Sequence, residues 1–169
     1  MQLELRPLDE GNLDDFAKEM QDAFQLAVEE GLENDDSPIL PRKDIDAAIV
    51  RPDACALEAV VGDERVGGAV LFLDKEGHEH ECALLYVKKG VHNRGVGTLL
   101  WEAIERSYPD AVAWRLCTPY FETRNIYFYL RKCGFHIVDL FEDGQGVQRG
   151  VQESSLMFSF MKRFDGNWR

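Results

Sequence analysis

The 169-residue sequence lacks the segments that direct a chain into or across a membrane. Its first residues carry no basic segment followed by an apolar stretch and small residues, as a secretory signal would. No apolar run approaches the ~20 residues that a membrane-spanning helix needs. We therefore expect a cytoplasmic protein with no membrane partner.

Paired cysteines are also missing. The four cysteines, Cys55, Cys82, Cys117 and Cys133, are far apart in the chain and form no C-x-x-C pair. Zinc ribbons and thioredoxin-type redox sites need such pairs, so the spacing argues against both classes. Reduced and mostly buried thiols are expected instead.

Positive charge is scarce as well. The formal net charge is -12, with 19 Lys and Arg against 31 Asp and Glu. Proteins that bind nucleic acid need clustered cations to contact the phosphates, so this composition argues against a nucleic-acid partner. The excess of acid is concentrated in residues 1–53, which hold 15 acidic and 5 basic side chains. An anion-binding site is therefore expected in the nearly neutral remainder of the chain.

What the chain does contain suits a soluble globular protein. Its 169 residues are 45% hydrophobic and 30% charged, which predicts one domain over residues 1–169. Alternating apolar residues predict strands, and apolar residues at a 3.6-residue period predict helices. The order of elements predicts a mixed α/β fold with helices on both sides of a sheet. Strands are expected at 2–8, 56–61, 65–73, 80–87, 111–118, 135–141 and 155–164, and helices at 12–31, 42–50, 96–108 and 123–134.

A glycine turn separates the strand expected at 80–87 from the helix that follows it. The turn reads RGVGT at residues 94–98. Unpaired N–H groups and the helix dipole favour an anion at such a helix N-terminus, glycines allow its close approach, and Arg94 adds charge. Leu100 breaks the G-x-G-x-x-G dinucleotide fingerprint, and the GKS or GKT of a P-loop is missing. An ordinary strand-to-helix turn is the alternative interpretation.

A second stretch, TRNIYFYLRKCGF at residues 123–135, predicts a short helix. Thr123 is its expected N-cap and Gly134 its expected C-terminal stop. Asn125 and Tyr129 are four residues apart, so they share one face of that helix. An amide suits an amide-rich ligand chain, and a phenol can donate a proton to a thiolate leaving group. The alternative is that Tyr129 is a core aromatic residue.

Together the two stretches resemble the motifs of GNAT-family N-acetyltransferases, which move an acetyl group from acetyl-CoA to an amine. HNRGVG is similar to the family pyrophosphate motif, Gln or Arg followed by x-x-Gly-x-Gly or Ala, with His92 in the first position. Asn125, Tyr129 and the Gly-Phe pair that follows are similar to the later family motif, although Phe128 stands where alanine is usual. The order of predicted elements agrees with the family over essentially the whole chain.

The resemblance implies a mixed, mostly antiparallel sheet of about six to seven strands flanked by about four helices. It implies transfer of an acetyl group from acetyl-CoA, as cosubstrate, to a primary amine of a small molecule or peptide. No metal is expected, because nothing elsewhere in the chain completes a ligand set with the HEHE stretch at residues 78–81. An acyl-CoA-binding sensor without catalysis is the alternative function. The residues expected to bind the cofactor are Leu85, Tyr86, Val87, His92, Asn93, Arg94, Gly95, Val96, Gly97, Thr98, Asn125 and Tyr129.

The resemblance also implies catalytic roles. Tyr129 is expected to act as the acid, and Glu81 matches the position of a carboxylate base early on the strand that leads into the turn. A regular strand would place Glu81 on one face with Ala83, Leu85 and Val87, an apolar wall that raises the pKa of a carboxyl group. The alternative bases are a water chain and the neighbours His78, Glu79 and His80.

The acceptor is expected on the side of the cleft that the first third of the chain forms in this family. Acidic side chains there would attract a cationic amine, and a solvated acidic loop is the alternative. Dimers are common in similar proteins, so a homodimer is one candidate assembly. The acids concerned are Glu29, Glu30, Glu33, Asp35 and Asp36.

Overall fold

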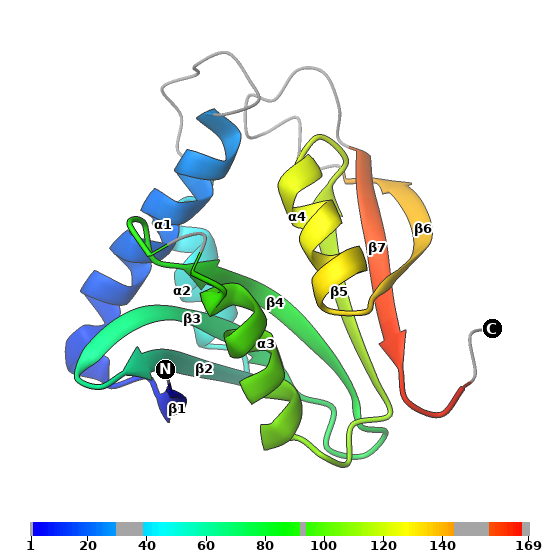
Figure 1. Ribbon diagram of the computed structural model, residues 1–169, viewed down its shortest axis with the longest axis horizontal. Coiled ribbons are helices and arrows are strands. Elements are labelled where there is room, and N and C mark those ends of the chain that lie inside the picture. The colour runs from blue at the N-terminus through cyan, green and yellow to red at the C-terminus, as the bar shows by residue number, and fades with distance from the viewer. Residues whose placement is uncertain (1, 30–38, 92–93, 144–155, 167–169) are drawn as a thin grey trace.

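The computed structural model describes residues 2–29, 39–91, 94–143 and 156–166. Within them, seven strands form one sheet in the order β1-β2-β3-β4-β5-β7-β6 (Figure 1). The pairing of β4 with β5 is parallel, and the other neighbours pair antiparallel. The mostly antiparallel sheet predicted from the sequence is therefore confirmed. The strands are β1 (Leu3–Pro7), β2 (Ala54–Val61), β3 (Glu64–Phe72), β4 (Glu79–Val87), β5 (Ala113–Pro119), β6 (His136–Glu142) and β7 (Leu156–Arg163).

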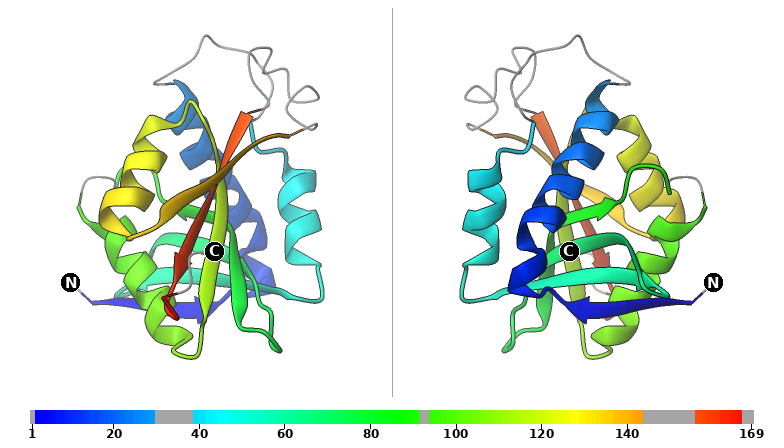
Figure 2. Two further views of the ribbon diagram at one scale, coloured as in Figure 1. Left: turned by 90° about the vertical axis from the view of Figure 1, so that its right-hand side faces the viewer. Right: turned by 90° about the vertical axis from the view of Figure 1, so that its left-hand side faces the viewer.

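Helices cover both faces of the sheet, as predicted. α1 (Leu13–Glu29) and α2 (Arg42–Ile49) lie on one face, and α3 (Val96–Ser107) and α4 (Thr123–Tyr127) lie on the other (Figure 2). A short 3-10 helix, η1 (Glu10–Asn12), precedes α1, and a π-helical turn, η2 (Phe128–Lys132), continues α4. Among the described residues, no helix is long and apolar enough to cross a bilayer.

Each face of the sheet has its own apolar core. On the α1 side, Phe16 and Met20 of α1 pack with Val70 of β3 and are fully buried. On the α3 side, Leu100 and Trp114 belong to a larger buried cluster that reaches η2 and β7. The 3.6-residue apolar period of α1 and α3 is what places these side chains on the sheet.

A β-bulge interrupts the alternation of β4. Val70 of β3 pairs with Leu84, whereas Leu71 pairs with Cys82, so Ala83 is an additional residue in β4. A residue inserted in this way moves the following side chains to the opposite face. Side chains at odd-numbered positions of β4 therefore face one helical layer before Ala83 and the other helical layer after it.

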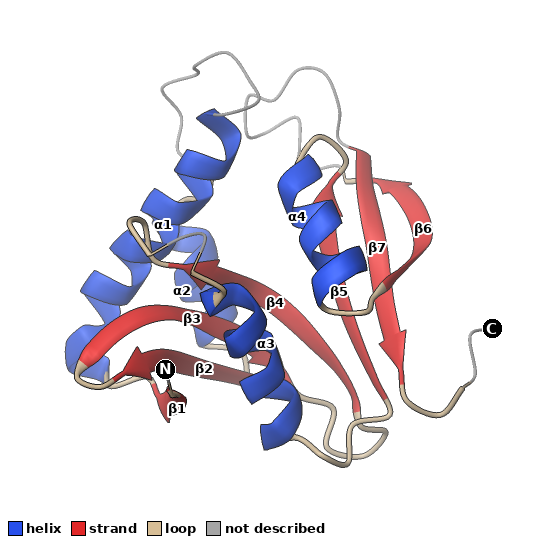
Figure 3. Cartoon of the chain, viewed as in Figure 1, coloured by secondary structure: helices blue, strands red, loops and turns tan. Residues whose placement is uncertain are grey.

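β4 and β5 pair for a short distance and then diverge (Figure 3). Their parallel register runs from Glu79–Ala113 to Glu81–Arg115, and no further pair joins them. In the described part of the chain, no strand pairs with this edge of β4 from Cys82 to Val87. The backbone N–H and C=O groups on that edge are therefore available to a ligand.

A half-buried ionic network fixes α1 on the sheet. Arg65 of β3 donates to Glu19 of α1 from Nε at 2.8 Å and from Nη2 at 3.1 Å, and it also pairs with the buried Glu58. The hydroxyl of Tyr86 donates to Glu19 at 2.9 Å. Burial alone would raise the pKa of Glu19, but the hydrogen bonds from Arg65 and Tyr86 outweigh it and lower that pKa.

We expect Arg65→Leu to lower the free energy of unfolding by about 3 to 5 kcal/mol, because it removes the cation that the partly buried Glu19 and the buried Glu58 share. Urea denaturation at neutral pH measures the loss. Arg6→Leu is the matched control: Arg6 pairs with Glu4 on the surface at 3.3 Å, and an exposed pair contributes less than about 1 kcal/mol.

Equal urea midpoints for the two variants would contradict this role of Arg65. The lowered pKa of Glu19 adds a pH signature. Its ionised form is favoured in the folded state, so its contribution to stability is present above its unfolded pKa and is lost as the pH falls through the folded value. The difference between wild type and Arg65→Leu should therefore shrink in acid.

Candidate active site

A cavity of about 330 Å³ lies between α1, the end of β4, the start of α3 and α4. It brings together nine residues that the sequence assigned to cofactor binding. Arg94 is exposed beside the cavity, and His92 and Asn93 lie outside the described residues. The nine residues that line it are Leu85, Tyr86, Val87, Gly95, Val96, Gly97, Thr98, Asn125 and Tyr129.

The glycine turn forms one end of the cavity. Gly95 is the N-cap residue of α3 and has φ +74°, a left-handed conformation that a residue without Cβ adopts readily. No side chain caps the helix, and the N–H of Leu99 is the one that reaches the carbonyl of Gly95, at 3.1 Å. The N–H groups of the first turn of α3 therefore lack partners within the helix.

Gly97 lies in close contact with Phe128. A Cβ on residue 97 would lie 3.1 Å from Cε2 and 3.2 Å from Cζ of Phe128, and 3.6 Å from a methyl group of Val87. The Phe128 ring, which stands where the family pattern has alanine, thus occupies the space beside the turn that a larger residue 97 would need. The two residues are complementary in size.

The helix that carries Asn125 and Tyr129 differs at its start from the prediction. Its N-cap is Glu122, whose carbonyl accepts from Ile126 at 3.0 Å. Thr123 is not the N-cap, because its hydroxyl is bonded to the carbonyl of Phe121 at 3.4 Å instead of to a helical N–H. At the other end Gly134 has φ +79°, which confirms it as the C-terminal stop.

Tyr129 lies inside the cavity wall and is 8% exposed. Its ring packs against Phe128, Phe135 and Phe160 at centroid distances of 5.2, 5.8 and 5.9 Å. Burial raises the pKa of Tyr129 well above the ordinary value, and the nearby Cys82 acts in the same direction. The phenol is therefore protonated at neutral pH. The face that it shares with Asn125 is the face that lines the cavity.

Sequence reasoning missed Glu122, which also lines the cavity. The Nδ2 group of Asn125 donates to its Oε2 atom at 2.5 Å. Burial raises the pKa of Glu122, and the hydrogen bond from Asn125 opposes that rise. Its position three residues before Asn125 was visible in the sequence, but nothing in the pattern indicated that this carboxylate is partly buried in a cavity wall.

The structure corrects the expected surroundings of Glu81. The bulge at Ala83 separates its face from that of Leu85 and Val87: Glu81 pairs with Phe72, which packs on the α2 side, whereas Leu85 and Val87 pack on the α3 side. Glu81 is exposed and is not part of the cavity wall.

The direction of the predicted pKa shift of Glu81 is nevertheless found. Neighbouring atoms desolvate its carboxyl group and raise its pKa, with Arg51 and Arg115 opposing the rise and Asp53 adding to it. The neighbouring groups are charged side chains, Arg51, Asp53 and Arg115, in place of the apolar wall that a regular strand would have provided.

The alternative bases have other partners and lie outside the cavity wall. Glu79 is paired with Arg163 at 3.2 Å and with Arg115 at 3.6 Å. His80 is 4% exposed, its Nδ1 accepts from the N–H of Asp74 at 3.1 Å, and burial lowers its pKa. His78 stacks against His80 with ring centroids 6.2 Å apart.

Two further groups of predicted residues have different outcomes. All four cysteines are free thiols, and Cys82 and Cys133 are buried as expected, but Cys117 is exposed on β5. The acids proposed to attract the acceptor lie in a segment of which the structure describes no side chain. They are Glu29, Glu30, Glu33, Asp35 and Asp36.

Comparisons with known proteins agree with the motifs. Residues 13–135 match the model of the Acetyltransferase (GNAT) family. The chain is 39% identical over 135 residues to the uncharacterized protein YrkN of Bacillus subtilis (strain 168). The matched region covers 79% of this chain and 73% of that protein.

Solved structures have the same fold. PaiA N-acetyltransferase from Thermoplasma acidophilum, in complex with coenzyme A, has a TM-score of 0.71 and 20% identity, over 97% of this chain and 100% of that one. A GNAT family acetyltransferase from Elizabethkingia anophelis with acetyl-CoA bound has a TM-score of 0.68 and 16% identity, over 96% of this chain and 98% of that one.

Proposed function

Because the chain belongs to the acetyltransferase (GNAT) family, we propose that it transfers an acetyl group from acetyl-CoA to a primary amine of a small molecule or peptide by direct attack. The observation that carries the proposal is a single cavity lined by the glycine turn, the free edge of β4 and the face of Asn125 and Tyr129. In this proposal, residues 1–169 form one acetyltransferase domain that works in the cytoplasm.

In this proposal the pyrophosphate of acetyl-CoA binds at the start of α3. The N–H groups of Val96, Gly97 and Thr98 point out of the helix end, where the dipole favours negative charge. Arg94 adds a positive charge beside them. His92 and Asn93 stay predictions as contacts from the preceding turn.

The pantetheine arm extends along β4. The edge of β4 that faces the diverging β5 has backbone groups at Leu85, Tyr86 and Val87 that can pair with the amides of pantetheine. Asn125 offers a side-chain amide on the opposite wall of the cavity. In this placement the thioester end of the arm reaches Tyr129, which lines the same cavity.

The acetyl group is transferred by attack of the amine nitrogen on the thioester carbonyl. A backbone N–H of β4 near Tyr86 or Val87 stabilises the oxyanion. The departing thiolate takes a proton from Tyr129, whose raised pKa keeps the phenol protonated until that moment.

The assignment of the base to Glu81 stays a prediction. Its carboxylate lies on the α1–α2 face of the sheet, so it can serve only an acceptor that reaches the thioester from that face, between the diverging β4 and β5. Desolvation raises the pKa of Glu81, which suits a base, while Arg51 and Arg115 counteract the rise.

Calorimetry with acetyl-CoA and a mass-spectrometric screen of primary amines test the proposed function. We expect acetyl-CoA to bind and at least one amine to be acetylated. Absence of binding at high micromolar acetyl-CoA would exclude both the enzyme and the acyl-CoA sensor. Binding without acetylation of any amine in the panel would favour the sensor.

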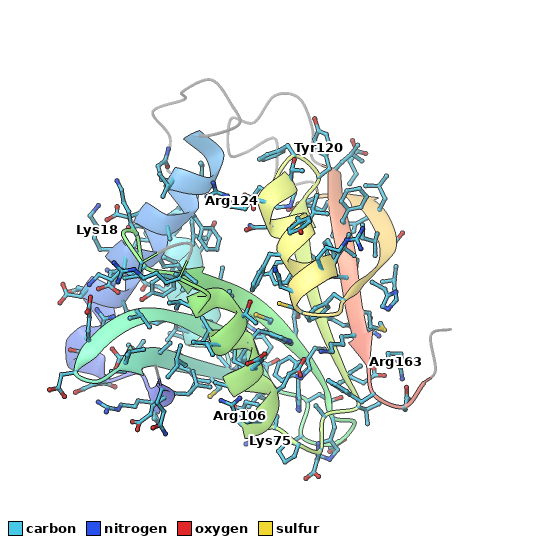
Figure 4. The ribbon with its side chains drawn as sticks, viewed as in Figure 1. Lys18, Lys75, Arg106, Tyr120, Arg124 and Arg163 are labelled. Carbon is cyan, nitrogen blue, oxygen red and sulfur yellow. The ribbon has the colours of Figure 1, made fainter. Side chains whose placement is uncertain are left out.

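We expect Tyr129→Phe to lower kcat about 100-fold, the usual contribution of a general acid, and to leave the acetyl-CoA Kd within about twofold. Steady-state kinetics and calorimetry provide the two values. Tyr120→Phe is the control, since Tyr120 is 41% exposed, lies outside the cavity wall and is labelled near the start of α4 in Figure 4. A large loss of affinity in Tyr129→Phe would assign the residue to binding instead.

We expect Gly97→Ala to weaken acetyl-CoA binding about tenfold, because the added methyl group must displace the Phe128 ring into the cavity at a cost of about 1 to 3 kcal/mol. Calorimetry checks the affinity. Gly11→Ala is the control, since its added Cβ meets nothing closer than Asp9 Oδ1 at 3.8 Å.

The double variant Gly97→Ala/Phe128→Ala identifies the cause. Removing the ring should restore part of the affinity that Gly97→Ala loses. If Gly97→Ala is folded and binds acetyl-CoA as the wild type does, the contact with Phe128 does not shape the site.

A further inference from the structure

Glu122 contributes a carboxylate to the wall of the cavity. Among the described residues that line it, Glu122 alone has an acidic side chain. α1 contributes apolar side chains, Ala23, Phe24 and Leu26, to the opposite wall. A carboxylate in such a place loses hydration unless a ligand or a neighbour compensates.

Its geometry places Glu122 in contact with the proposed reaction machinery. As the N-cap residue of α4 it is fixed at the helix start, and its carboxylate accepts a hydrogen bond from Asn125. It also lies within electrostatic range of Tyr129, one of the groups that its charge affects. The three side chains line the same cavity.

We propose that Glu122 receives the acceptor: its carboxylate binds the ammonium group of the incoming amine and takes up its proton. The inference rests on the proposed acetyl transfer. It assigns to Glu122 the removal of the proton from the amine, a step that the sequence assigned to Glu81. Glu122 lines the cavity that contains Tyr129, whereas Glu81 lies on the other face of β4. An amine held by Glu122 therefore approaches the thioester on the cavity side.

The reaction balances with Glu122 in this role. The ammonium loses one proton to the Glu122 carboxylate, which later passes it to water. The free amine then forms the C–N bond, and as the C–S bond breaks its electron pair goes to sulfur, which takes the proton of Tyr129. The nitrogen loses its second proton through water to the Tyr129 phenolate, so the products are the N-acetyl amide, coenzyme A and one proton in solution.

The surroundings of Glu122 raise the pKa of its carboxyl group above the ordinary value. Burial raises its pKa, and the hydrogen bond from the neutral Asn125 opposes the rise. A base must be ionised to act, so kcat/KM should rise with pH through this raised pKa. The other titratable or charged residues of the cavity wall are Tyr86 on β4, Arg124 and Tyr127 on α4, and Tyr129 and Lys132 on η2; Arg124 is labelled in Figure 4 between α4 and the upper part of α1.

Glu122→Gln tests the inference in the full chain. Glutamine keeps an oxygen that can accept from Asn125, so the position of Asn125 is preserved while the base is removed. The acceptor is the amine that wild type acetylates fastest among spermidine, a lysine-containing peptide, an aminoglycoside and phenethylamine. We expect kcat/KM to fall about 100-fold with the acetyl-CoA Kd within about twofold.

The pH profile separates a base from a positioning residue. In Glu122→Gln the rise of kcat/KM with pH on the acidic side of the profile should disappear. The loss of kcat/KM relative to wild type should shrink as the pH approaches the pKa of the acceptor amine, because a free amine needs no base. A deficit that is the same at every pH would overturn the inference. Glu102→Gln, on the exposed side of α3, is the unchanged control.

Glu81→Gln tests the competing assignment, in which Glu81 is the base. A loss of kcat/KM and of the acidic limb in Glu81→Gln, with Glu122→Gln active, would overturn the inference in favour of Glu81. Failure of the proposed function would look different. Wild type itself would then acetylate none of the four amines, and the inference would fall with it.

Discussion

The divergence of β4 from β5 is the constraint on which the site depends. A sheet normally satisfies the backbone groups of its inner strands by pairing both edges. Here the pairing ends at Glu81 and Arg115, which leaves the edge of β4 beyond that point open to the cavity. The opening lies in the middle of the sheet, so helices of both layers border it, and a ligand with amide groups can replace the missing strand.

The walls of the cavity are held by contacts outside it. Lys162 of β7 donates to the carbonyl of Cys133 at 2.7 Å and to Glu105 of α3 at 2.5 Å. One side chain thus ties the end of η2 to α3 on the same face of the sheet. Because η2 carries Tyr129, this tether fixes the phenol relative to the glycine turn, which α3 carries at its other end.

The sequence predicted the features that depend on local pattern. The strands and helices lie within a few residues of the expected ranges because periodicity records which face is buried. Asn125 and Tyr129 share a face because they are four residues apart. The face of Glu81 was wrong because a bulge at Ala83, an alanine with no distinctive chemistry, depends on pairing with β3. Glu122 was missed because its place in the cavity wall depends on α1, β4 and α4 lining one cavity, which no local pattern records.

The two candidate carboxylates show why burial and position must be considered together. The pKa of Glu81 and the pKa of Glu122 are both raised by desolvation. Near Glu81, Arg51 and Arg115 oppose the rise, and each of them favours the ionised form of the carboxylate without bringing an amine closer. At Glu122 the opposing effect is a hydrogen bond from the neutral Asn125, and an ammonium ion that enters the cavity would add positive charge beside this partly buried carboxylate and favour its ionised form. Substrate binding and activation of the base are then the same event, and that coupling is available only to a carboxylate in the wall of the cavity.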